Sequence, residues 1–115
     1  MFQRTTIVGS LGKDPELRYL PSGKAVTNIS VATNRTWKND AGEKQEEVLW
    51  FRVAVWGAQA ESVNQYLSKG SKVLVEGRML EPKAYTNNAG ETVASLEMVA
   101  ERVIFLSSKS DDVSF

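Results

Sequence analysis

Residues 48–57, with the sequence VLWFRVAVWG, are the stretch that decides how this chain folds. Side chains on a β-strand alternate between its two faces. One face of this strand is apolar and is expected to pack on a core, with Leu49, Phe51, Val53 and Val55. The other face carries two indoles on either side of a guanidinium, with Trp50, Arg52 and Trp56 at steps of two residues.

Two indoles and a guanidinium on one half-open face are suited to a flat, charged polymer. Successive nucleobases stack on aromatic rings, and a cation between the rings holds phosphate. We therefore expect Trp50, Arg52 and Trp56 to form a stacking platform for single-stranded nucleic acid. The alternative is a strand buried on both faces, with Arg52 extending to solvent from its middle.

The composition excludes most classes of enzyme. The chain has 115 residues and contains no Cys and no His. Their absence removes disulfides, thiolate nucleophiles, Cys/His zinc sites and imidazole acid–base catalysis. The carboxylate pairs Asp14/Glu16 and Glu46/Glu47 have no further group beside them to support chemistry. We expect a protein that is not an enzyme and uses neither a metal nor a cofactor.

The charge balance argues against binding that is mainly electrostatic. The 14 basic and 14 acidic residues give a formal net charge of zero, whereas a duplex-binding protein is usually basic. Stacking does not require an excess of positive charge, and Arg52 is the charged residue within the strand at 48–57. The binder is therefore expected to act by stacking, with local rather than overall positive charge.

No apolar segment predicts a membrane partner or secretion. No window approaches the roughly 20 apolar residues of a membrane-spanning helix, and the first residues, MFQRTTIVG, lack an apolar segment of signal-peptide length. A length of 115 residues fits one domain with one modest core. We expect a single domain in the cytoplasm.

The rest of the chain predicts four more strands and one helix. Residues 2–9, 24–37, 71–80 and 92–106 read as strands, and Gly77 indicates a bulge or bend. The last of these ranges also matches a helical period, but its VIFL ending and the hairpin before it favour a strand. Residues 58–69 have apolar residues at helical spacing, with Gly70 as the expected C-cap.

Three segments connect the predicted strands, one of them irregular and two of them hairpins. Residues 10–23 are broken by Gly and Pro and read as a connection that packs down. Residues 37–47 read as a polar link that joins two strands as a long, mobile hairpin, with turn residues at Asp40 and Gly42. Residues 83–92 form a hairpin tip with its turn at 87–90.

This order predicts an all-β chain with one short helix between the third and fourth of five strands. Such an order is typical of a five-stranded Greek-key barrel of the oligonucleotide/oligosaccharide-binding kind, the OB fold. Residues 1–106 are expected to form this domain, and residues 107–115 a short, flexible acidic tail.

Five segments carry a resemblance to a known family: VGSLGKDPELRYLPSG at 8–23, AVTNISVAT at 25–33, WFRVAVWG at 50–57, YLSKGSKVLVEG at 66–77 and YTNNAG at 85–90. From about Phe2 to Leu106 the chain resembles the bacterial-type single-stranded DNA-binding proteins, which are replication accessory proteins. The resemblance implies a homotetramer that binds single strands without sequence preference in replication, recombination and repair, in the cytoplasm and on the nucleoid.

The resemblance also implies which residues contact DNA. The stacking positions of the family correspond to Trp37, Trp50, Trp56 and Tyr85. Its backbone-contacting basic positions correspond to Arg4, Arg18, Lys38, Arg52, Lys69 and Lys83. Two alternatives stay open, because Trp37 could cap the barrel and Tyr85 could pack within its own hairpin.

The family commonly ends in an acidic tip that recruits other proteins of DNA metabolism. Asp111, Asp112 and Phe115 stand in the corresponding places, although Ser114 replaces a proline and little linker precedes them. The resemblance therefore implies replication and repair proteins as partners, with an ordinary chain terminus as the alternative. Other functions of the same barrel are a primosome-type or RNA-binding role, since stacking ignores the 2′-hydroxyl, or a module that binds protein or sugar.

Overall fold

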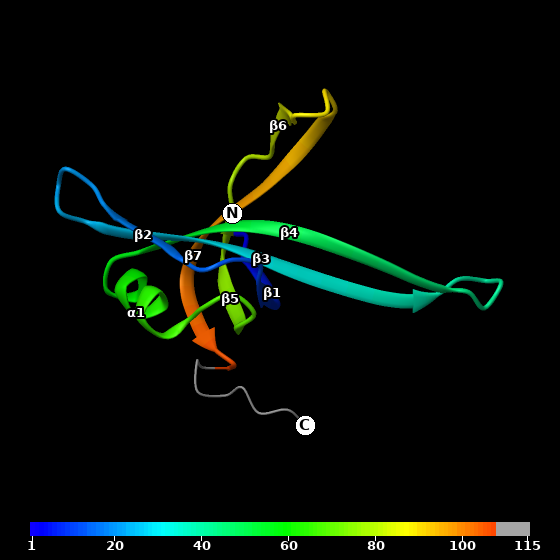
Figure 1. Cartoon of the computed structure of the whole chain (residues 1–115), viewed down its shortest axis with the longest axis horizontal. Helices are drawn as coiled ribbons and strands as arrows, with labels where there is room; N and C mark the ends of the chain where they lie inside the picture. Colours follow the sequence, from blue (N-terminus) through cyan, green and yellow to red (C-terminus); the bar gives the residue numbers. More distant parts are fainter. Residues whose placement is uncertain (108–115) are drawn as a thin grey trace.

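The computed structural model describes residues 1–107 and shows a closed β-barrel with two projecting hairpins (Figure 1). Among these residues, the barrel strands are β1 (Thr5–Leu11), β3 (Ala25–Lys38), β4 (Lys44–Trp56), β5 (Lys72–Met79) and β7 (Thr92–Phe105). Helix α1 (Ala58–Tyr66) lies between β4 and β5 in the sequence, and two short strands are added at β2 (Glu16–Tyr19) and β6 (Lys83–Thr86). The predicted five-stranded barrel with one helix is confirmed.

The strands pair in the order β1-β5-β7-β4-β3, and β3 returns to β1 through the pairs Ser10–Ala32 and Leu11–Val31. The pairing of β4 with β7 is parallel and the others are antiparallel. Residues 92–106, which also fitted a helical period, form the strand that was predicted. The register of β5 against β7 shifts between Glu76 and Gly77, which confirms the predicted bulge.

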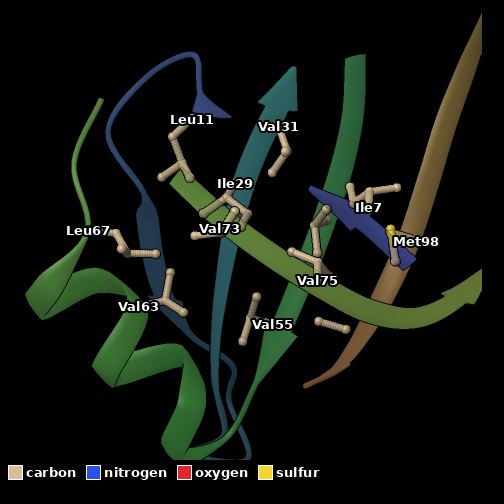
Figure 2. Close-up of a cluster of buried hydrophobic side chains, with 12 residues drawn as sticks. Ile7, Leu11, Ile29, Val31, Val55, Val63, Leu67, Val73, Val75 and Met98 are labelled. Atoms are coloured by element: carbon tan, nitrogen blue, oxygen red, sulfur yellow. The ribbon is translucent and has the colours of Figure 1, made fainter. Parts of the chain in front are cut away.

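The core fills the barrel with alternate side chains of each strand (Figure 2). Val53 and Val55 are fully buried, as predicted, and the partly buried Phe51 packs against the core. Leu49 was expected in the same core, but it is 42% exposed. The reason is that β4 begins well before the barrel and reaches it only near Phe51, where its pairing with β7 starts.

Helix α1 closes the core on one side through Val63 and Ala60. The buried Thr27 hydroxyl donates a hydrogen bond of 2.7 Å to the carbonyl oxygen of Ala60, which ties the helix to β3. The helix ends at Tyr66, because Leu67 turns extended and enters the core. The prediction of Gly70 as the C-cap was therefore wrong. In residues 1–107, no helix is long and apolar enough to cross a lipid bilayer.

One segment that was expected to be irregular contains a strand, and one predicted hairpin is paired further than expected. Residues 16–19 pair with the first half of β3 as β2, which satisfies an edge that β3 would otherwise expose. Residues 37–47 form the predicted hairpin, but β3 and β4 pair without interruption out to Lys38–Lys44, so the unpaired polar part is shorter than expected. Both faces of this hairpin are solvated beyond the barrel, so its strands lack the apolar alternation that identifies a strand in sequence.

The bond between Thr27 and Ala60 predicts a measurable cost. Thr27→Val keeps the shape of the side chain but removes the donor, and we expect the free energy of unfolding to fall by about 1–3 kcal/mol. Urea denaturation at matched protein concentrations measures this change. Thr33→Val is the control, because its hydroxyl makes an exposed bond of 3.4 Å to Leu49. Equal losses in the two variants would contradict the structural role of Thr27.

Candidate nucleic-acid interface

The outer face of β4 presents the three side chains of the stacking platform. Trp50 is 53% exposed, Trp56 is 42% exposed, and Arg52 between them is also exposed. The core residues Val53 and Val55 occupy the opposite face of the same strand. These exposures exclude the alternative of a strand buried on both faces.

Trp50 owes its position to the small residues beside it. Ala32 faces Trp50 and Ser30 faces Arg52 across the β3–β4 ladder, and the backbone N–H of Gly12 donates to the carbonyl oxygen of Ser30. A Cβ built on Gly12 would collide with Cζ3 and Cη2 of Trp50. The indole therefore reaches across β3 and lies against the bare backbone of Gly12. The small side chains of Ala32 and Ser30 leave the room that this ring needs.

The outer face continues from β4 onto β7 and β6. On β7, Glu97 is in register with Arg52 of β4. Two other residues of β7 pair with β6: Ser95 with Lys83, and Val93 with Tyr85. Residues that pair across two strands point to the same face of the sheet, and so do residues two positions apart on one strand. Lys83 and Tyr85 therefore point to the same side as Arg52. Tyr85 is 54% exposed, which is inconsistent with its being a packing residue of the hairpin.

Trp37 lies on a different face from the platform. The β3–β4 ladder has no break between Val26 and Lys38, so side chains of β3 alternate regularly between its two faces. Trp37 lies six residues after the core residue Val31 and therefore points to the same face as Val31. That face is opposite to the one that carries Trp50. It pairs with Gln45 near the end of the hairpin, beyond the closure of the barrel at Ala32. Trp37 is 39% exposed and does not cap the barrel.

Two residues near these aromatics were missed by the sequence analysis. The guanidinium of Arg35 lies over the Trp37 ring, 4.5 Å from its centroid, and it is also 4.0 Å from the Glu47 carboxylate. The spacing of two residues on one strand is the signal that would have placed Arg35 beside Trp37. Gly12 is the second, and its contact with Trp50 has no signal in the sequence.

The structure brings several of the expected basic residues to the aromatic surface. Arg18 on β2 is in register with Val26, which is in turn in register with Trp56. Lys69 follows α1, and its N–H donates to Asp14 Oδ1 at 2.8 Å, close to Gly12 and hence to Trp50. Lys38 ends β3, opposite Lys44. Within residues 1–107, five of the expected cations form no ion pair: Arg18, Lys38, Arg52, Lys69 and Lys83.

Arg4 is placed differently from the other expected basic residues. It precedes β1, and its guanidinium lies 3.8 Å from the carboxylates of both Glu76 and Glu101, on the side of the barrel formed by β5 and β7. Its charge is balanced there, away from the platform. The expected tail residues Asp111, Asp112 and Phe115 lie outside the described residues.

Tyr19, the neighbour of Arg18 on β2, has a perturbed hydroxyl. It donates a hydrogen bond of 3.2 Å to Glu61 Oε1 on α1. This bond, together with the negative charge of Glu61, raises the pKa of Tyr19 above its usual value of 10.0. The bond joins β2 to the helix.

Comparisons with known proteins identify a family. The single-strand binding protein family matches residues 2–106. A single-stranded DNA-binding protein of Wolinella succinogenes is 42% identical over 109 residues, covering 95% of this chain and 67% of the relative. A single-stranded DNA-binding protein of Halalkalibacterium halodurans is 44% identical over 106 residues, covering 92% of this chain and 61% of the relative. The chain thus spans 61% to 67% of the length of these curated relatives.

Solved structures share the fold. A Plasmodium falciparum SSB in complex with ssDNA has a TM-score of 0.78 at 24% identity, covering 93% of this chain and 97% of its own. A deletion mutant of the single-stranded DNA binding protein from Thermus aquaticus has a TM-score of 0.72 at 26% identity, covering 94% of this chain and 52% of its own. The resemblance noted from sequence is confirmed: by its family match and by its identity to these relatives, the chain belongs to the single-strand binding protein family.

Proposed function

We propose that this protein binds single-stranded DNA without preference for base sequence and keeps it unpaired and protected in replication, recombination and repair. The observation that carries the proposal is the exposed platform of Trp50, Arg52 and Trp56 on the outer face of β4. The names of the relatives, which are single-stranded DNA-binding proteins, support the same function. Such a protein acts in the cytoplasm, on the nucleoid, and is not an enzyme.

The mechanism follows from the order of side chains on the platform. Bases stack on the two indoles, and each stacked base contributes about 1–3 kcal/mol. Arg52 lies between the rings and holds the phosphate that links the stacked nucleotides. Every base offers a π-face, so stacking tolerates any sequence. Lys83 and Tyr85 extend the same surface onto β6 and give the strand a path beyond β4.

We also infer that the protein works as a homotetramer. Val8, Leu74 and Ile104 are in register across β1, β5 and β7 and form an apolar row on the outside of the barrel. Val8 is exposed, and Leu74 and Ile104 are only half-buried. Within the described residues, β1 pairs with β3 only at Ser10 and Leu11, which leaves much of one edge free. A neutral chain with few free cations gains affinity when several barrels engage one strand.

The platform predicts a loss of affinity from each of its members. Trp50→Ala and Trp56→Ala are each expected to weaken binding by about 1–3 kcal/mol. Arg52→Ala is expected to lower the slope of log affinity against log salt by about 0.7, the value for one single-strand phosphate contact. Anisotropy of labelled oligo(dT) at several salt concentrations measures both, with oligo(U) and an oligosaccharide testing the other ligand classes. Tyr66→Ala is the control, since Tyr66 is an exposed aromatic on α1. Parent-like affinity in both Trp variants would rule out the platform.

Gly12 predicts an indirect effect on the same platform. A methyl group in Gly12→Ala collides with the Trp50 ring, so the indole must leave its place and binding is expected to weaken, by no more than in Trp50→Ala. The same anisotropy titration measures the change. In a Trp50→Ala background, Gly12→Ala is expected to cost nothing further, because the displaced ring is absent. Additive losses would show that Gly12 acts independently of Trp50.

The proposed tetramer predicts the molecular mass of the protein in solution and a substitution that lowers it. Light scattering of the parent at micromolar concentration is expected to give the mass of four chains. Val8→Glu places a charge in the apolar row and is expected to lower that mass, because a buried unpaired charge is costly. Ser22→Glu adds the same charge in an exposed turn and is expected to leave the mass unchanged. A parent of monomer mass, with and without DNA, would contradict the tetramer.

A further inference from the structure

The turn that follows β1 carries the backbone against which Trp50 lies. This turn spans residues 12–15, between β1 and β2, and the Trp50 ring fills the space where a Cβ on Gly12 would stand. The N–H of Gly12 donates to the carbonyl oxygen of Ser30 at 2.9 Å, which fixes the start of the turn on β3. In the part of the chain that the structure describes, no backbone–backbone hydrogen bond holds residues 13–15. The end of the turn therefore depends on side-chain contacts.

The side chain of Asp14 ties this turn to the segment between α1 and β5. Its Oδ1 atom accepts a hydrogen bond of 2.8 Å from the backbone N–H of Lys69. A carboxylate that accepts from a backbone N–H forms a charge-assisted bond, which is shorter and stronger than a bond between neutral groups. Lys13 pairs with Glu16 at 3.2 Å, but this ion pair stays within the same stretch of chain. Among the described residues, the bond to Asp14 is thus the hydrogen bond that joins residues 13–15 to a distant segment.

The segment that donates this bond is itself held firmly. The N–H of Ser71 donates to the carbonyl oxygen of Ser68 at 2.9 Å, and the hydroxyl oxygen of Ser71 accepts from the N–H of Ser68 at 3.1 Å. Leu67, just before this segment, and Leu11, just before the turn, are buried in the same core cluster (Figure 2). Asp14 therefore anchors the far end of the turn to a part of the chain that the core keeps in place.

We propose that Asp14 is a positioning residue for the platform. Through its bond to the Lys69 N–H it holds the turn, and with it the backbone of Gly12, in place against the Trp50 ring. A ring whose support moves samples more orientations, and a stacking base then has to order it at an entropic cost. The proposal rests on the proposed function and deepens it, because it makes a carboxylate outside the platform responsible for the order of one of the platform rings.

The charge of Asp14 and its hydrogen bond act on DNA binding in opposite directions. A carboxylate near the path of the strand repels phosphate, so removal of the charge favours binding. Loss of the hydrogen bond frees the turn and weakens binding. Asp14→Asn removes the charge and keeps an oxygen that can accept from the N–H, whereas Asp14→Ala removes both. The two variants have the same net charge, so a difference between them reports the hydrogen bond.

Anisotropy titrations of labelled oligo(dT) compare the two variants, under conditions in which urea denaturation shows that both are folded. Asp14→Ala is expected to bind about threefold or more weakly than Asp14→Asn, and Asp14→Asn at least as tightly as the parent. The difference is bounded by the effect of Trp50→Ala, about fivefold to 150-fold, because displacing the ring costs no more than removing it. In a Trp50→Ala background, the two Asp14 variants are expected to bind equally.

Tryptophan fluorescence of the protein without DNA is a second readout, which a loss of charge alone would not change. The emission of Asp14→Ala is expected to differ from that of Asp14→Asn, because the surroundings of the Trp50 ring are no longer fixed. In a Trp50→Phe background, the same pair of variants is expected to give identical spectra. The comparison therefore assigns the change to this ring and not to the other two indoles.

Equal affinities of Asp14→Ala and Asp14→Asn would overturn the proposal, whether both variants bind more tightly or more weakly than the parent. A difference in affinity that persists in the Trp50→Ala background would also overturn it, because the turn would then act on DNA without the ring. If the Asp14 variants are equal while Trp50→Ala still weakens binding, the positioning role is wrong and the proposed function stands. If Trp50→Ala and Trp56→Ala have no effect either, the proposed function itself fails.

Discussion

The ladder between β3 and β4 is the constraint on which the rest of the structure depends. It runs without a break from Val26–Trp56 to Lys38–Lys44, and it fixes which side chains enter the barrel. A slip of one residue would exchange the two faces of a strand, which would bury Trp50 and expose Val53. The same alternation that builds the core therefore also presents the platform, so fold and binding surface have one origin.

The chain divides its binding groups between a rigid and a projecting part. The platform lies on a strand that is paired on both sides, by β3 and β7, and Trp50 is further fixed against Gly12. Trp37 and Tyr85 lie on hairpins that extend beyond the barrel (Figure 1). A chain with zero net charge cannot rely on its overall field, so rings held in place and a few unpaired cations are the physical basis of the proposed affinity.

Features that follow from the alternation of apolar side chains around a core were predicted from the sequence. Features that depend on solvated strands, or on contacts between residues far apart in the chain, were missed. The faces of residues 48–57, the strand at 92–106 and the bulge at Gly77 followed from periodicity and glycine. The prediction that Leu49 is buried was wrong, because the sequence does not reveal where β4 enters the barrel. Strand β2 and the full extent of pairing in the 37–47 hairpin were missed because polar strands carry no apolar period. The contact of Gly12 with Trp50 joins residues far apart in sequence, and only the barrel brings them together.

The central claim is that bases stack on the indoles of the outer face of β4. Titration of intrinsic tryptophan fluorescence with oligo(dT), at low and at 1 M salt, tests it most directly. Stacked indoles are quenched by bases, and stacking is screened by salt far less than phosphate contacts are. The account predicts strong quenching at saturation under both conditions, with a higher oligonucleotide concentration needed at 1 M salt. Saturable binding by anisotropy without any change in tryptophan fluorescence would contradict it.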